Sequence, residues 1–250
     1  MAGIPARLAW RRATVLRHID ETPHVKSLVL DVSGWVGHRA GQHLDVRLTA
    51  EDDYQTERSY SISSAPAEPQ VTLTIERLDD GEVSPYLTDV LHPGDELEVR
   101  GPIGGWFTWR PEEGGPLLLV AGGSGIVPLM AMIRERAAVQ SPVPVCLLAS
   151  SRSFEEIIYR EELDRWAAAD MDLVVVHTLT RSQPTGWQGY HRRIDRAMLE
   201  EVGWTPAEHP LVFVCGPTPL VESVATLCVE LGHAPERVKT ERFGPTGGPA

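Results

Sequence analysis

Hydrophobic and polar positions alternate along the first part of the chain and change their period near residue 110. Between Arg7 and Arg100, short alternating segments are separated by clusters of Pro, Gly and Asp, a pattern typical of antiparallel strands. The expected strands cover residues 13–19, 27–32, 43–48, 58–63, 71–76 and 96–100. Strands at this spacing favour a closed barrel or a sandwich. A short helix is expected over Ser84–Leu91, with Ser84 as its N-cap and Pro85 as its first helical residue.

Beyond residue 115 the apolar segments become continuous and alternate with helical ones. Strands are expected at residues 116–121, 143–150, 172–179, 210–216 and 238–243, and helices at 127–140, 154–169, 193–202 and 219–231. Continuous apolar strands that alternate with helices indicate a parallel sheet covered on both faces. The pattern therefore predicts two domains, an antiparallel β-barrel over residues 1–112 and a doubly wound α/β domain over residues 113–250.

The composition is that of a folded globular protein. Of the 250 residues, 42% are hydrophobic and 23% charged, which excludes a disordered or fibrous chain. The formal net charge of −12 argues against nucleic acid as a partner, because an acidic surface repels phosphate polymers. No apolar run approaches the roughly 20 residues that a membrane span needs, so no membrane partner is expected.

The first residues and the cysteines point to a cytoplasmic protein. The segment MAGIPARLAWRRATV lacks the apolar core of a secretory signal, and Cys146, Cys215 and Cys228 are scattered, as in proteins of a reducing compartment. Three distant cysteines also cannot supply the four thiolates of an iron–sulfur cluster. No metal site is expected, and any redox chemistry needs another cofactor.

A glycine-rich turn, GGSGIVP at residues 122–128, follows an apolar strand and opens a helix. Glycines let the backbone approach a pyrophosphate, and the helix N-terminus supplies N–H donors and a favourable dipole. The motif reads GxGxxP in place of GxGxxG, so a tight turn without a ligand explains it about equally well.

The segment RSYSISS, residues 58–64, presents different chemistry on its two faces. On an extended strand Arg58, Tyr60 and Ile62 share one face, and the serines at 59, 61 and 63 share the other. A charge, an aromatic plane and hydroxyls together suit a planar cofactor that carries a phosphate. The alternative is an amphipathic strand with a surface arginine.

Cys215, Gly216 and Pro217 close a buried strand at the edge where open α/β sheets bind their ligands. The thiol can therefore contact a bound cofactor. The alternative is a small buried thiol that packs as an apolar side chain.

Seven motifs in one order, RSYSISS, GEVSPYL, GPIGGWF, GGSGIVP, TRSQPTGW, CGP and ERFG, resemble those of the ferredoxin–NADP⁺ reductase family. The resemblance covers nearly the whole chain. It implies that FAD binds to the first domain and a nicotinamide nucleotide to the second, with hydride transfer achieved mainly by holding the two close together.

The resemblance also assigns the flavin site. Arg58 would contact the FAD pyrophosphate, Tyr60 would stack on the isoalloxazine, and Ser61 would form a hydrogen bond near flavin N5. The remaining positions assigned to the flavin are Ser59, Ile75, Gly81, Val83, Ser84 and Phe243. Of these, Ile75 would lie along the flavin, and Gly81 to Ser84 would offer backbone donors to a phosphate.

The nicotinamide nucleotide has its own set of residues in the family pattern. The residues that would bind it are Gly123, Ser124, Gly125 and Pro128, with Cys215, Gly216 and Pro217 beside the nicotinamide ring. By the same likeness Glu241 and Phe243, in the closing ERFG, approach the flavin from the nicotinamide side. The expected catalytic residues are Ser61, Cys215 and Glu241.

Charges after the second and third parallel strands favour NADPH over NADH. By resemblance, Thr180, Arg181 and Tyr190 would bind the 2′-phosphate and adenine, with Arg152 as a further candidate. NAD-binding sites often place an acid in this region. Two arginines without a matching acid therefore favour NADP, and NAD is the less favoured cofactor.

The function expected from the resemblance is that of an FAD-dependent oxidoreductase. It would take a hydride from NADPH and pass electrons singly to a separate carrier protein, such as a ferredoxin, a flavodoxin or an oxygenase component. One alternative is an NAD(P)H reductase of free flavin or another small acceptor, and another is a non-catalytic flavin-bearing relay subunit. The missing iron–sulfur cysteines imply an outside electron acceptor.

A basic patch could dock an acidic carrier. Arg7, Arg11, Arg12 and Arg17 precede any acidic residue, and on a regular strand Arg11 and Arg17 would share one face while Arg12 would not. Solvated arginines on the first strand are the alternative.

Overall fold

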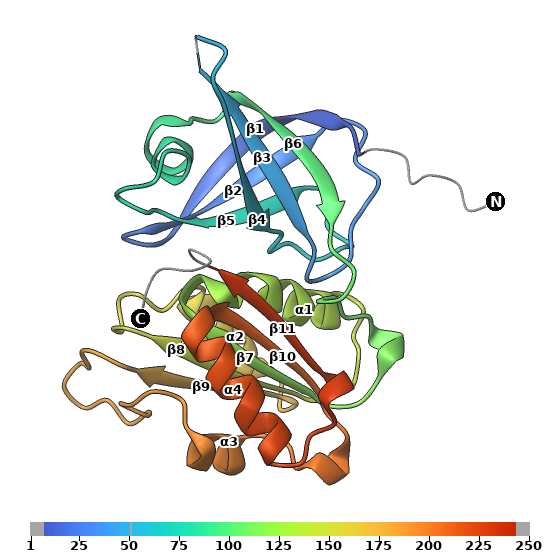
Figure 1. Ribbon diagram of the computed structural model, residues 1–250, viewed down its shortest axis with the longest axis vertical. Coiled ribbons are helices and arrows are strands. Elements are labelled where there is room, and N and C mark those ends of the chain that lie inside the picture. The colour runs from blue at the N-terminus through green and yellow to red at the C-terminus, as the bar shows by residue number, and fades with distance from the viewer. Residues whose placement is uncertain (1–7, 51, 244–250) are drawn as a thin grey trace.

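The computed structural model describes residues 8–50 and 52–243, which form two domains placed one above the other (Figure 1). Within these residues, the first domain holds an antiparallel sheet of six strands and the second a parallel sheet of five. The predicted fold class is therefore confirmed for both parts of the chain.

The first domain is a β-barrel. Its strands are β1 (Trp10–Thr22), β2 (Val25–Val32), β3 (His43–Thr49), β4 (Gln55–Ser61), β5 (Val71–Glu76) and β6 (Glu96–Ile103), in the order β4-β3-β6-β1-β2-β5. A bridge between Ile62 and Leu73 brings the two edge strands together. Alternate apolar residues of all six strands point inward and form one buried core.

A helix does occur within the expected range Ser84–Leu91, but its form and its cap differ from the prediction. The segment makes a π-helical turn over Tyr86–Val90, and Pro85 occupies the N-cap position without a side-chain hydrogen bond. The Ser84 hydroxyl accepts a hydrogen bond from the Leu78 N–H at 3.0 Å, so it closes the preceding loop and does not cap the helix.

The second domain is doubly wound. Its parallel strands are β7 (Leu117–Gly122), β8 (Val145–Ser151), β9 (Leu173–Leu179), β10 (Leu211–Pro217) and β11 (Val238–Phe243), in the order β11-β10-β7-β8-β9. Helices α1 (Ile126–Ala138) and α2 (Arg160–Ala169) cover one face, and α3 (Arg196–Val202) and α4 (Thr218–Glu230) the other. The strand order reverses between β7 and β10, where open sheets of this type bind ligands.

Two helices begin later than their hydrophobic pattern predicts. Helix α2 begins at Arg160 and not near Phe154, because Tyr159 adopts a left-handed conformation (φ 59°) that a helix cannot contain. Helix α3 begins at Arg196 and not near Arg193, because the Asp195 side chain accepts a hydrogen bond from the Met198 N–H and caps it there.

The docking patch expected on β1 is not formed as predicted. Val15 pairs with Leu30 but Arg17 pairs with Val29, so a β-bulge between them turns Arg17 to the opposite face from Arg11. Arg12 shares the face of Arg17 and forms an ion pair with Glu96 at 3.2 Å. Arg7 lies outside the described residues.

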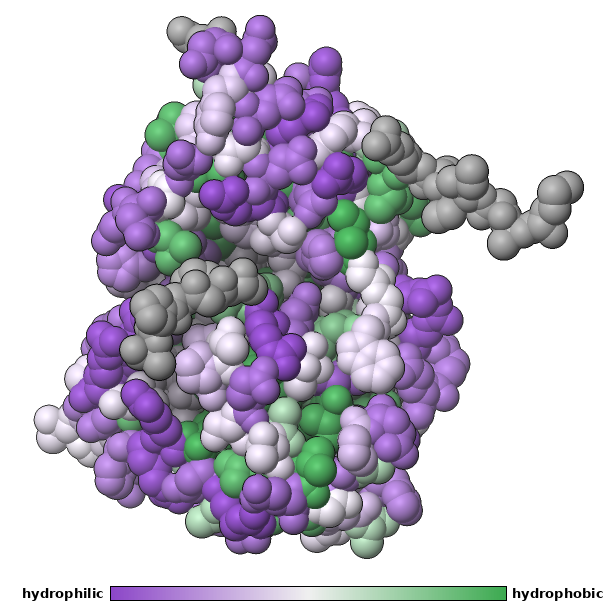
Figure 2. Space-filling model, in the orientation of Figure 1, coloured by the Kyte–Doolittle hydropathy of each residue, from purple (hydrophilic) through white to green (hydrophobic). Residues whose placement is uncertain are grey.

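No helix within the described ranges is long and apolar enough to cross a bilayer. On the face drawn in Figure 2, hydrophilic residues cover most of the surface, and hydrophobic residues occur in small separate groups.

Candidate active site

The glycine-rich turn after β7 packs directly against the end of β10. A Cβ atom on Gly125 would lie 2.2 Å from the Cys215 carbonyl oxygen, so only glycine permits this contact. Gly216 has φ +151°, and a Cβ atom built on it would lie 3.0 Å from the backbone N and O atoms of Gly122. The two loops therefore meet at the point where the strand order reverses.

One side of this turn is open. Gly123 is exposed, has φ +54°, and a Cβ atom built on it would meet no atom of the described residues within 4 Å. Ser124 is half-buried and Pro128 is buried in the first turn of α1. Exposed backbone at a helix N-terminus offers N–H donors to an anion, which fits the pyrophosphate of a dinucleotide.

Cys215 and Glu241 lie opposite each other in the register of β10 and β11. Burial, and then the charge of Glu241, raise the pKa of the Cys215 thiol well above its usual range, so the thiol is neutral. Burial raises the pKa of Glu241 to about 7, and its Oε2 atom has no hydrogen-bond partner among the described residues. The carboxyl end of β11 points toward the underside of the barrel (Figure 1).

Ser61 ends β4 on the barrel side. It is 5% exposed, and its hydroxyl oxygen is also buried without a partner in the described part of the chain. A buried hydroxyl without a hydrogen bond costs free energy, so such atoms usually meet water or a ligand. Ser61 and Glu241 thus contribute one such atom from each domain.

The other residues of β4 divide between its two faces. Arg58 is exposed, and its guanidinium bonds only the Thr56 hydroxyl and the Glu57 carbonyl, with no carboxylate partner among the described residues. Tyr60 lies on the same face, and burial raises its pKa to about 12. Ser59 lies on the opposite face and donates a hydrogen bond to Asp45 at 2.6 Å. Arg58 and Tyr60 are therefore available to a ligand, while the Ser59 side chain is engaged.

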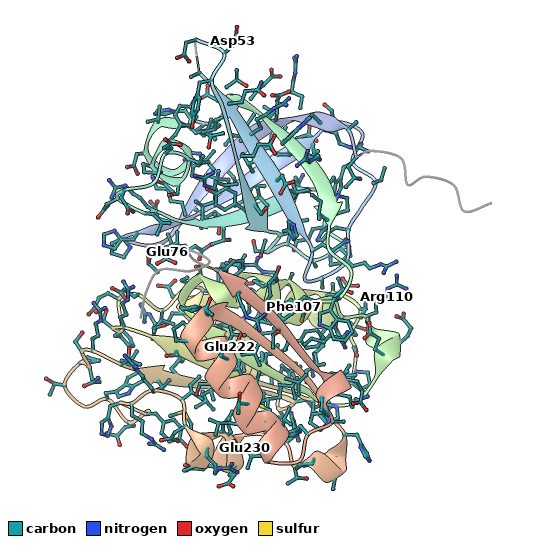
Figure 3. The ribbon with its side chains drawn as sticks, viewed as in Figure 1. Asp53, Glu76, Phe107, Arg110, Glu222 and Glu230 are labelled. Carbon is teal, nitrogen blue, oxygen red and sulfur yellow. The ribbon has the colours of Figure 1, made fainter. Side chains whose placement is uncertain are left out.

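The remaining expected flavin residues are mostly part of the barrel itself. Ile75 is fully buried and Val83 is 1% exposed, both in the barrel core. A Cβ atom on Gly81 would lie 3.0 Å from the Ser84 hydroxyl, which holds this loop tight. Strand β5, which carries Ile75, contacts the Gly123–Gly125 turn, and Figure 3 shows Glu76 at the lower edge of the barrel. Phe243 is half-buried against the cluster beneath α1 and α2.

The loops that follow β8 and β9 are joined by backbone hydrogen bonds and carry one arginine each. The Arg181 N–H donates to the Arg152 carbonyl at 2.9 Å, and the Thr180 N–H donates to the Ser151 carbonyl at 3.0 Å. Both arginines are exposed, and neither forms an ion pair within the described residues. Loops far apart in the sequence thus present two positive charges at one edge of the sheet.

The Tyr190 side chain makes its contacts within the second domain. Its ring packs against the cluster beneath α3 and α4, and its hydroxyl is hydrogen-bonded to Glu201, which raises the pKa of the phenol. An aromatic pair that is not among the expected site residues lies in the loops after β8 and β9: the ring centroids of Phe154 and Trp187 are 6.0 Å apart. The signal was present, since Phe154 follows Arg152 closely and Trp187 ends the TRSQPTGW motif.

No group of three or more His, Cys, Asp or Glu residues within the described ranges has an arrangement that could hold a metal ion. All three cysteines are free and buried.

Two family descriptions match the chain in succession. Residues 13–108 match "Oxidoreductase FAD-binding domain" and residues 119–226 match "Oxidoreductase NAD-binding domain".

Among relatives, the ferredoxin–NADP reductase B of Sorangium cellulosum is 34% identical over 194 residues, which cover 76% of this chain and 79% of that protein. The glycine betaine monooxygenase reductase subunit of Pseudomonas aeruginosa is 34% identical over 211 residues, which cover 83% of this chain and 57% of that protein. The chain therefore spans little more than half the length of this second relative.

Solved structures share the fold. The FAD/NAD-binding domain of a nitric oxide dioxygenase from Vibrio cholerae superposes with a TM-score of 0.83 at 24% identity, over 94% of this chain and 99% of that one. A ferredoxin NADP⁺ reductase from Neisseria gonorrhoeae superposes with a TM-score of 0.79 at 20% identity, over 93% of this chain and 98% of that one.

Proposed function

Since the chain belongs to the ferredoxin–NADP⁺ reductase family of flavoprotein reductases, we propose that it takes a hydride from NADPH onto FAD and passes the electrons singly to a separate carrier protein. The observation that carries this proposal is that two candidate site residues, Ser61 of the barrel and Glu241 of the second domain, each bury a polar atom that has no hydrogen-bond partner among the described residues. Both are groups that a bound cofactor or substrate would satisfy.

The barrel residues fit FAD. Arg58 has no carboxylate partner among the described residues, so its exposed guanidinium would bind a phosphate. The half-buried Tyr60 ring would cover an aromatic plane, and the Ser61 hydroxyl would donate a hydrogen bond to it. When bound, FAD accepts a hydride, which is one proton with two electrons, and can release the electrons one at a time. The chain's contribution is to bind and orient, so no catalytic triad is needed.

The second domain fits a nicotinamide nucleotide. The open backbone at Gly123 would bind the pyrophosphate, and Cys215, Gly216 and Pro217 would border the nicotinamide. The neutral Cys215 thiol would pack there without adding charge, and Glu241 would hold a proton or a negative charge nearby, depending on pH.

The adjacent Arg152 and Arg181 support NADPH as the preferred donor. Two exposed guanidiniums at one edge of the sheet suit a 2′-phosphate, and no acid occurs in residues 151–153 or 180–182. The names of the relatives, a ferredoxin–NADP reductase and a monooxygenase reductase subunit, support a ferredoxin, a flavodoxin or an oxygenase component as the electron acceptor.

We also propose a domain boundary at residues 112/113, between the two matched segments, and a cytoplasmic location, which the free cysteines support.

The proposal is tested on the purified protein under anaerobic conditions. We expect it to carry FAD, NADPH to bleach the flavin absorbance, and an added carrier to restore that absorbance. A flavin that neither NADPH nor NADH reduces would reject the reductase function and favour a relay subunit, and reduction by NADH alone would reject NADPH as the donor. If NADPH bleaches the flavin but only small acceptors reoxidise it, the proposal that a carrier protein is the electron acceptor would be rejected.

Arg181→Ala tests the choice of nucleotide. Loss of one charge-assisted phosphate contact should raise the KM for NADPH about tenfold, which corresponds to roughly 1.4 kcal/mol, and leave the KM for NADH nearly unchanged. Arg165→Ala, which removes an exposed arginine from α2, should change neither value. Equal changes for NADPH and NADH in Arg181→Ala would show that Arg181 does not read the 2′-phosphate.

A further inference from the structure

A charged side chain crosses the interface between the two domains. Arg134, on α1, donates from Nη1 to the Ser63 carbonyl of the barrel at 2.8 Å. Its Nε and Nη2 atoms donate to the two carboxylate oxygens of Glu162, on α2, at 3.0 and 2.7 Å. The Arg134 side chain is 15% exposed and that of Glu162 is 23% exposed, so water screens this bidentate pair weakly.

Tyr159 makes the second crossing. Its hydroxyl donates to the Thr74 hydroxyl of β5 at 2.5 Å, and Thr74 in turn lies 3.1 Å from the Ser63 hydroxyl. The Arg134 guanidinium lies 5.0 Å from the centroid of the Tyr159 ring, within the range of a cation–π contact. We call this set of five residues, Ser63, Thr74, Arg134, Tyr159 and Glu162, the Arg134 bridge.

The contacts of the Arg134 bridge stabilise an unfavourable backbone conformation at Tyr159. Tyr159 is 2% exposed and adopts φ 59°, a left-handed conformation that typically costs a residue with a side chain about 1 to 3 kcal/mol. Burial raises the pKa of its phenol, so the hydroxyl stays protonated and donates to Thr74. The surrounding contacts therefore determine both the backbone and the hydrogen bond of this residue.

The bridge joins the two halves of the candidate active site. Arg134 lies six residues beyond Pro128 on α1, the helix that opens with the glycine-rich turn, or about 9 Å along its axis. On the barrel side, Ser63 follows Ser61 by two residues and Thr74 directly precedes Ile75. A rigid link at these points therefore fixes the position of the glycine-rich turn relative to the barrel segments that carry Ser61 and Ile75.

We propose that the Arg134 bridge is a positioning device, which fixes the glycine-rich turn relative to Ser61 and so determines the rate of hydride transfer more than the affinity for either cofactor. This inference rests on the proposed function. Its physical basis is that hydride transfer requires a near-attack arrangement, in which a displacement of about 1 Å can cost roughly a hundredfold in rate.

Two substitutions in the FAD-loaded full chain test the bridge. Arg134→Gln removes the charge, and Tyr159→Phe removes only the hydroxyl that reaches Thr74. In both variants we expect flavin reduction at saturating NADPH to be about tenfold slower or more, with NADPH affinity and FAD content nearly unchanged. Arg134→Lys keeps a donor for the Ser63 carbonyl but loses the planar fork, so its rate should be intermediate.

Arg136→Gln is the matched control. Arg136 lies on the same helix and is more deeply buried, with 5% side-chain exposure, but it pairs with Asp170 and the Val143 carbonyl inside the second domain. This variant should lower the unfolding temperature yet reduce its flavin at the parental rate. Parental rates in Arg134→Gln and Tyr159→Phe, or equal slowing in Arg136→Gln, would overturn the proposal.

A readout that needs no turnover separates this inference from the proposed function. Amide hydrogen exchange of β5 should be faster in Arg134→Gln than in the parent, and unchanged in Arg136→Gln. If NADPH failed to reduce the parent's flavin, the proposed function would fall, and faster exchange in Arg134→Gln would still support the bridge. Unchanged exchange in that variant would overturn it.

Discussion

At the scale of single residues, Glu241 makes stability depend on pH. Burial raises its pKa from 4.5 to about 7, so between these values the folded protein holds a proton that the unfolded chain has lost. The stability contributed by this proton is fully present below about pH 4.5 and is lost as pH rises through about 7. Glu241→Gln cannot titrate, so its unfolding temperature should fall less between pH 5 and 8 than that of the parent.

The control for this prediction is another carboxyl group close to β11. Glu222, on α4 (Figure 3), is exposed and forms an ion pair with Arg242. Glu222→Gln should keep the parental dependence of unfolding temperature on pH. The same decline in Glu241→Gln as in the parent would show that Glu241 is ionised over this whole range.

At the scale of elements, the contact between the glycine-rich turn and β10 depends on Gly125. A Cβ atom there would lie 2.2 Å from the Cys215 carbonyl oxygen, so Gly125→Ala must push the turn away from β10. We expect a loss of about 1 to 3 kcal/mol in the free energy of unfolding, together with weaker NADPH binding. Thermal unfolding measures the change in stability, and titration of the flavin absorbance with NADPH measures the change in binding.

Gly105→Ala provides the comparison, because a Cβ atom on Gly105 would meet no atom in the described part of the chain within 4 Å and its backbone is not left-handed. This variant should match the parent in both measurements. Parental NADPH affinity in Gly125→Ala would contradict a role for the turn in binding the nucleotide.

At the scale of the whole molecule, the net charge of −12 governs encounters with charged carriers. Because the β1 bulge separates Arg11 from Arg17, this strand does not present the basic patch expected to offset the charge. Reduction of an acidic carrier should therefore become faster as salt rises and screens repulsion beyond roughly 10 Å, while a neutral small acceptor should be insensitive. Stopped-flow rates at several ionic strengths measure this, and slower reduction of an acidic carrier at high salt would reveal a basic patch elsewhere.

Most of the fold could be predicted because strand and helix periods are local properties of the sequence. All expected strands occur, with ends shifted by a few residues. The starts of α2 and α3 were wrong, because the left-handed Tyr159 and the Asp195 cap act over single residues that periodicity does not report. The roles assigned to Ser61, Cys215 and Glu241 stay predictions. The proposed function rests on Ser61 and Glu241, whose buried polar atoms have no partner among residues 8–50 and 52–243.

The sequence by itself determined the two domains and the place of the glycine-rich turn, since both follow from patterns within short segments. Only the tertiary structure decided which residues lie next to each other. The pairing register turned Arg17 away from Arg11, the order of β8 and β9 brought Arg152 to Arg181, and domain packing brought Arg134 to Ser63. Burial of Glu241 likewise depends on the strands and loops packed around it, so its raised pKa is a property of the folded molecule and not of its motif.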